Sequence, residues 1–129
     1  MVKCIVEINS STVGSTGRIM FMIAETARKH GFTVYTCSAV HGNEKRIESK
    51  NHIYIGSKLD KKIHLLLAKK TGYNGCFSHF TTAQFLKKID KLQPDLIHFH
   101  NLHNCYINLP MLFDYVKKKN IPVVWTLHD

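Results

Sequence analysis

Short runs of aliphatic and β-branched residues alternate along this chain with longer segments in which apolar residues recur at helical spacing. This alternation is typical of a parallel sheet whose strands are joined by helices that cover its faces. Runs suited to strands occupy residues 3–8, 33–40, 52–55, 96–99 and 121–127. Segments with helical spacing occupy residues 17–29, 58–70, 81–92 and 108–119. We therefore predict an α/β fold with a parallel sheet flanked by helices.

The length and composition fit one domain. A chain of 129 residues can bury a core of its own, and 44% hydrophobic with 21% charged residues is typical of a folded protein. No internal repeat, linker or low-complexity segment divides the chain. Residues 1–129 are therefore predicted to form a single Rossmann-like domain.

Three local predictions concern burial and helix starts. The run 121–127 is largely apolar, and we expect it to form a buried strand. The helix that runs to Leu92 is expected to begin at a cap on Thr81 or Thr82. The residues of the first helix expected to face the sheet are Ile19, Met22, Ile23 and Ala27.

The compartment is predicted from segments that the sequence lacks. No apolar run approaches the roughly 20 residues needed to cross a bilayer, and the first residues show no secretion leader. The cysteines are scattered and lack the C-x-x-C spacing of a zinc or redox site; they are Cys4, Cys37, Cys76 and Cys105. We therefore predict a reduced, cytoplasmic protein.

The net charge of +9 is the unusual bulk property. Its lysines are grouped at positions 58, 61 and 62, at 69 and 70, at 87, 88 and 91, and at 117–119. Basic surfaces attract nucleic acid, anionic lipid or phosphorylated ligands. The alternative is that these lysines form solvated helix faces and complement helix dipoles. No nucleic-acid-binding signature accompanies the charge, so no nucleic-acid partner is predicted.

The first segment with chemical potential is V-G-S-T-G-R, between the first strand and the first helix. Gly14 and Gly17 let the backbone approach a ligand closely, and the N–H groups of a helix N-terminus favour an anion. Ser15 and Thr16 add hydroxyl groups, and Arg18 can reach a phosphate. The segment matches neither a Walker loop nor a dinucleotide fingerprint. A purely structural turn is the alternative.

The second segment is P-D-L-I-H-F-H-N-L-H-N, from Pro94 to Asn104. Alternation along a strand puts His98 and His100 on one face, with His100 near the carboxyl end. A metal site formed by His98, His100 and His103 is one interpretation, but it lacks a nearby carboxylate or thiolate. We favour His100 and Asn101 as ligand-facing groups and His98 as a core histidine, and we predict no metal.

The third segment is W-T-L-H-D, at residues 125–129. Ligands of parallel α/β sheets bind beyond the carboxyl ends of the strands, which is where His128 and Asp129 fall. A histidine there can hydrogen-bond a sugar hydroxyl or exchange a proton near neutral pH. An exposed histidine with no function is the alternative.

Together these segments resemble the N-terminal domain of GT-B glycosyltransferases of family 4, which are retaining enzymes. The resemblance covers the whole chain in order, through I-N-S-S-T-V-G-S-T-G-R-I, Q-P-D-L-I-H-F-H-N and P-V-V-W-T-L-H-D. The more specific motifs are I-H-F-H-N-L-H-N-C-Y-I-N-L-P and V-V-W-T-L-H-D, which look like those of bacterial enzymes that build cell-surface polysaccharides. The loop G-S-T-G departs from the commoner adjacent glycine pair of the family.

The resemblance implies a two-domain transferase with its active site between two Rossmann-like domains. This chain would be the acceptor-side domain, with the C-terminal, donor-binding domain absent, and would be inactive alone. His128 would be the catalytic residue that contacts the donor sugar, and residues 14–17 would contact the donor diphosphate. Arg18, His100, Asn101 and Asp129 would line the cleft. The family needs no metal, and no cofactor is expected.

The expected partners are a nucleotide-sugar donor and a saccharide or lipid-linked acceptor. The segment Lys58 to Lys70 is amphipathic and flanked by lysines, so we predict that it contacts an anionic membrane at its cytoplasmic face. The alternative function is a non-catalytic Rossmann-like module that binds a nucleotide or a phosphorylated ligand. A third hypothesis is a basic protein that binds nucleic acid, but no recognition motif supports it.

Overall fold

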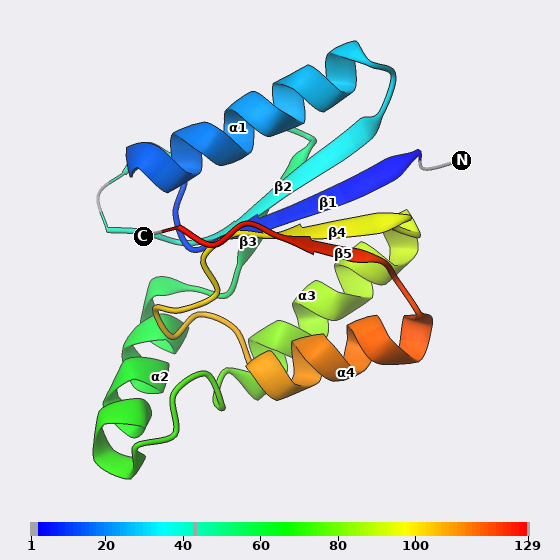
Figure 1. Cartoon of the computed structure of the whole chain (residues 1–129). Coiled ribbons are helices and arrows are strands. Elements are labelled where there is room, and N and C mark those ends of the chain that lie inside the picture. Colours follow the sequence, from blue (N-terminus) through cyan, green and yellow to red (C-terminus); the bar gives the residue numbers. More distant parts are fainter. Residues whose placement is uncertain (1–2, 43, 129) are drawn as a thin grey trace.

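A computed structural model describes residues 3–42 and 44–128, and it is built around one five-stranded parallel sheet (Figure 1). The strands lie in the order β3-β2-β1-β4-β5, so β1 sits between β2 and β4. Their bounds are β1 (Cys4–Asn9), β2 (Thr33–Ala39), β3 (His52–Ile55), β4 (Leu96–Phe99) and β5 (Val123–Trp125). The predicted Rossmann-like α/β fold is confirmed.

Four helices accompany the sheet. One face carries α1, the opposite face carries α3 and α4, and α2 lies to one side of the latter pair (Figure 1). Their bounds are α1 (Gly14–Lys29), α2 (Lys58–Thr71), α3 (His79–Leu92) and α4 (Leu109–Lys119). None of the helices in the described part of the chain is both long and apolar enough to cross a membrane.

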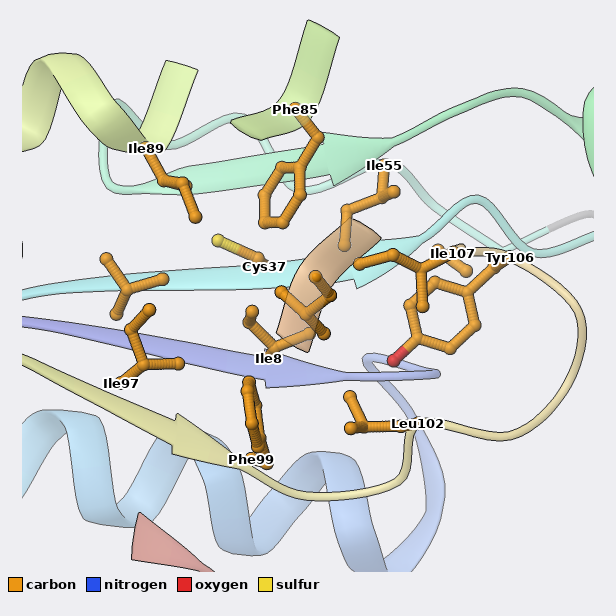
Figure 2. Packing of buried hydrophobic residues seen from close by; sticks show 13 residues of the cluster. Ile8, Cys37, Ile55, Phe85, Ile89, Ile97, Phe99, Leu102, Tyr106 and Ile107 are labelled. Atoms are coloured by element: carbon orange, nitrogen blue, oxygen red, sulfur yellow. The ribbon is translucent and has the colours of Figure 1, made fainter. Parts of the chain in front are cut away.

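The hydrophobic core lies between the sheet and the α3–α4 layer. Successive residues of a strand point to opposite faces, so Val6 and Ile8 of β1 face this layer and pair with Ile97 and Phe99 of β4. Phe85 of α3 packs with them (Figure 2). The apolar residues of β1 and β4 therefore fix the sheet on one pair of helices.

The face of the sheet toward α1 is polar although it is buried. Glu7 is only 1% exposed, and it pairs in register with Thr36 of β2 and His98 of β4. The other buried polar residues on this face are Asn9, Ser38, His52 of β3 and His100, which directly follows β4. Burying this many polar groups is costly unless they bond to one another. The ionisable and hydrogen-bonding side chains of the interior therefore gather on the face of the sheet toward α1.

Several local predictions are wrong. Helix α1 begins at Gly14 rather than near Gly17, so the expected loop supplies the first helical turn. The buried residues of α1 are Gly17, Met20 and Ala24, and Gly17 lies close to the backbone of the preceding loop. Of the residues expected there, Ile19 is 38% and Met22 is 60% exposed.

Two further elements differ from prediction. The last strand spans only Val123–Trp125 and is exposed, because it is the edge strand of the sheet and pairs only with β4. Helix α3 begins at His79 after Ser78, and Ser78 lies three to four residues before the predicted threonine cap. Helix α4 has the predicted position, and it is capped by the Asn108 side chain, which accepts a hydrogen bond from the Met111 amide.

Candidate functional site

The candidate site lies at the carboxyl ends of β1, β4 and β5. In open α/β sheets, ligands bind at the point where the strand order reverses, which here is the boundary between β1 and β4. A pocket of about 580 Å³ opens at this edge. His100, Asn101, Trp125 and His128 line it, together with apolar side chains from α2, α4 and the loop after β4.

A buried cluster of one carboxylate and two histidines lies at the inner end of this site. His100 Nε2 lies 2.9 Å from Glu7 Oε2, and both side chains are at most 1% exposed. His98 Nδ1 lies 3.7 Å from Glu7 Oε1, which is too long for a hydrogen bond. Glu7 Oε1 is buried and has no hydrogen-bond partner. The carboxylate is thus held mainly by His100.

The cluster continues outward to the last segment of the chain. His100 Nδ1 lies 3.0 Å from His128 Nε2, and the two ring planes are nearly parallel, at an interplanar angle of 15°. His98 Nε2 lies 2.8 Å from the Thr126 hydroxyl. The Trp125 indole N–H donates to the His100 carbonyl at 3.0 Å. These contacts hold the segment after β5 against β4.

The electrostatic environment keeps Glu7 ionised and His128 neutral. Burial alone would raise the pKa of Glu7, but the hydrogen bond from His100 and the proximity of His98 lower it below its ordinary value. Desolvation, together with the nearby His100 and His98, lowers the pKa of His128. The site therefore presents a neutral imidazole at its rim and a carboxylate at its base near neutral pH.

The first turn of α1 joins the same network through Asn9. The Asn9 side-chain amide donates to the Thr16 hydroxyl at 3.2 Å and to the Ser11 carbonyl at 2.9 Å. Its oxygen accepts the backbone N–H of Asn101 at 3.1 Å. One fully buried asparagine at the end of β1 thus connects the start of α1 to the segment that follows β4.

The structure brings some of the sequence-predicted residues together and leaves others apart. His100, Asn101 and His128 share the pocket, and Thr16 reaches them through Asn9. Residues 14–18 do not line the pocket. Within that segment, Gly14, Ser15 and Arg18 are exposed and Gly17 is buried. Asp129, predicted as a cleft residue, lies outside the described residues.

The predicted grouping of histidines requires a correction. Glu7, His98 and His100 have ligand atoms within 4.8 Å of one another, and they form the one group among the described residues that could hold a metal ion. A carboxylate is therefore present where the sequence showed none, and exposed His103 is not a member. Both nitrogens of His100 and Nε2 of His98 already have partners, so hydrogen bonding accounts for most of this geometry.

Sequence reasoning missed Glu7, Asn9 and Thr126. The signal for Glu7 was a charged residue inside the apolar run C-I-V-E-I-N, which a solvated strand face would also explain. Glu7 and His100 are 93 positions apart, and only the pairing of β1 with β4 makes them neighbours.

Comparison with known proteins gives no match, either to a protein-family model or to a curated protein.

Proposed function

We propose that this chain is the acceptor-side domain of a retaining glycosyltransferase of the GT-B type, which transfers a sugar from a nucleotide diphosphate to a saccharide or lipid-linked acceptor. The observation that carries the proposal is the network at the boundary between β1 and β4. It connects the first turn of α1, through Asn9, to the segment after β4, where His100 contacts His128 of the segment after β5. A diphosphate-binding helix N-terminus and a sugar-binding histidine would meet at this edge.

Each group has a separate task in the proposed reaction. The N–H groups of residues 14–16 have no partner within the first turn of α1, and they would approach the donor diphosphate because the helix dipole favours negative charge there. His128 would contact a hydroxyl group of the donor sugar. The mostly apolar pocket beside it, with Trp125 at its rim, would take the acceptor. The donor nucleotide would bind to a second domain, so this chain alone would bind the donor weakly and transfer no sugar.

Nuclear magnetic resonance titration tests the donor site on this chain. We expect UDP- and GDP-sugars to shift the amide signals of residues 14–17 and the ring signals of His128 together. Inorganic diphosphate should shift the former group only, because it has no sugar. Arg18→Ala, one exposed position further along α1, should weaken the first set of shifts and leave the second. Sugar nucleotides that shift neither set would refute the proposal.

The alternative function, a non-catalytic module for a nucleotide or phosphorylated ligand, predicts a different result. Such a module would bind a nucleoside diphosphate as tightly as the corresponding sugar nucleotide, and His128 would not respond to the sugar. A transferase that contains this domain should release nucleoside diphosphate from a sugar nucleotide when the acceptor is present, whereas a non-catalytic module should release none. An assay of that release with a labelled sugar separates the two functions.

We further propose that the transferase contacts an anionic membrane through α2. Leu59, Ile63 and Leu66 lie along one side of this helix and are 67%, 49% and 65% exposed. The opposite side, with His64 and Ala68, is buried against the domain. Exposed lysines border the apolar side; they are Lys58, Lys62, Lys69 and Lys70. An apolar strip bordered by lysines suits the interface of a negatively charged bilayer.

Vesicle co-sedimentation tests this contact. We expect binding to vesicles that contain phosphatidylglycerol, weaker binding at high salt, and little binding to phosphatidylcholine alone. The double variant Leu59→Glu and Leu66→Glu should abolish it. Met22→Glu makes the same kind of substitution, with one negative charge instead of two, at an exposed position of α1 and should have no effect. Equal binding of wild type and the double variant would exclude α2 as the membrane surface.

A further inference from the structure

Glu7, His100 and His128 form a continuous line from the buried interior to the pocket. Glu7 Oε2 lies 2.9 Å from His100 Nε2, and His100 Nδ1 lies 3.0 Å from His128 Nε2. The first two side chains are essentially inaccessible, whereas His128 is partly exposed and lines the pocket. The proposed transferase reaction gives Glu7 no role, so the presence of a buried carboxylate at this position requires a separate explanation.

The positions of the protons follow from what each group can donate. An ionised carboxylate only accepts hydrogen bonds, so the hydrogen between Glu7 and His100 belongs to His100 Nε2. In a neutral imidazole, the other nitrogen then carries a lone pair, so His100 Nδ1 accepts. The hydrogen of the second contact therefore belongs to His128 Nε2. This leaves His128 Nδ1 without a proton.

We propose that Glu7 is a positioning residue that acts through His100 to fix His128 as the Nε2–H tautomer. His128 Nδ1 then offers a lone pair, and it accepts a hydrogen bond from a hydroxyl group of the bound ligand. A carbonyl or phosphate oxygen offers no hydrogen and is disfavoured at that atom. The ligand group is a sugar hydroxyl only if the proposed transferase function holds, whereas the tautomer follows from the two contacts of His100 when Glu7 is ionised and His100 is neutral.

The surrounding contacts support this role. The hydrogen bond between the nearly parallel rings of His100 and His128 orients the outer ring, and the Trp125 indole N–H donates to the His100 carbonyl and holds its backbone. His98 bonds to Thr126 beside the line and contributes no hydrogen bond to Glu7. The same use of a second group to set which imidazole nitrogen is protonated is common where a histidine contacts a ligand.

A charged His100 would give the opposite arrangement. An imidazolium donates from both nitrogens, so His100 would donate to His128 Nε2, and His128 would carry its proton on Nδ1. The two arrangements differ in the protonated nitrogen of one residue, which long-range ¹H–¹⁵N correlation spectra read directly. The wild-type chain, ¹⁵N-labelled and treated with a chelator at about pH 8, should show His128 as the Nε2–H form. The Nδ1–H form or an even mixture would overturn the proposal.

Glu7→Gln tests the cause of the tautomer. The amide can donate to His100 Nε2, which allows His100 to carry its proton on Nδ1 and forces His128 Nε2 to accept. We expect the Nε2–H fraction of His128 to fall. Glu25→Gln makes the same chemical change at an exposed position of α1 and should leave the tautomer unchanged. An unaltered His128 tautomer in a folded Glu7→Gln variant would refute the proposal.

Two wild-type measurements decide the question if Glu7→Gln does not fold. The ¹³C signal of the Glu7 carboxyl group should be that of a carboxylate at about pH 6; a protonated Glu7 would overturn the proposal. Addition of Zn²⁺ should leave the ring signals of His98 and His100 unchanged. If both sets of signals shifted because the two rings bind the metal, the proposal would also be overturned. Neither measurement uses a sugar nucleotide, so failure of the transferase function would leave this result intact.

Discussion

Replacement of Gly17 by alanine tests how closely the first turn of α1 approaches the preceding loop. A Cβ atom at position 17 would lie 2.5 Å from the backbone carbon and 2.6 Å from the backbone oxygen of Thr12. Ordinary contact begins at 3.4 Å, so the loop would have to move by about 0.9 Å. Overpacking costs about 1–3 kcal/mol, and a backbone cannot rotate away as a side chain can. The higher helix propensity of alanine returns at most about 1 kcal/mol. We expect a net loss of about 2 kcal/mol of unfolding free energy, from the upper end of that range.

Thermal and urea unfolding measure this loss. For a domain of this size, about 2 kcal/mol corresponds to a fall of about 7 °C in Tm. Gly14→Ala is the matched control in the same turn. Its φ of +75° strains an alanine by about 1 kcal/mol, but a Cβ there meets nothing within 4 Å. A Gly17→Ala variant as stable as wild type, or more stable than Gly14→Ala, would refute the close approach of α1 to residues 11–12.

Three further predictions concern pH and helix capping. Burial lowers the pKa of His52 from its ordinary 6.5 to about 4, so the folded state keeps it neutral. The unfolded chain takes up a proton below 6.5, so stability should fall as pH drops from 6.5 toward 4 and be unaffected above. In His52→Gln the urea midpoint should fall less over this window; an equal fall would contradict the assignment. The pKa of Asp95 should lie below its ordinary 3.8 in a ¹³C titration, because the backbone N–H groups of Cys4 and Lys3 donate to its carboxylate. Ser57→Ala, which removes the hydroxyl that caps α2, should cost about 1 kcal/mol in urea unfolding, and no loss would show that the cap is not used.

Much of the fold was predictable because it rests on local patterns. The strands at residues 52–55 and 96–99 have the predicted bounds, since each is a short apolar run that ends at a turn or a change in polarity. The helix predicted at residues 108–119 is also present, and Asn108 caps it as a local rule about helix starts requires. The faces of α1 were harder, because the position at which this helix begins depends on the contact between Gly17 and Thr12.

The candidate site was predictable only at its rim. His100, Asn101 and His128 follow strand ends, where parallel sheets bind ligands, so residue type and position were enough to select them. Glu7 lies in the middle of a strand, and its role depends on which strand pairs with β1. The sequence shows neither strand order nor register, so it cannot place Glu7 beside His100.

The sequence by itself determined the alternation of strands and helices, because the period of the apolar residues reports which face of each element is buried. It also determined which polar groups stand at the ends of the strands. The tertiary structure decided the polar face beneath α1 and the line from Glu7 to His128. These contacts join residues about 90 and 30 positions apart, and they exist only because the order β3-β2-β1-β4-β5 brings β1, β4 and β5 together.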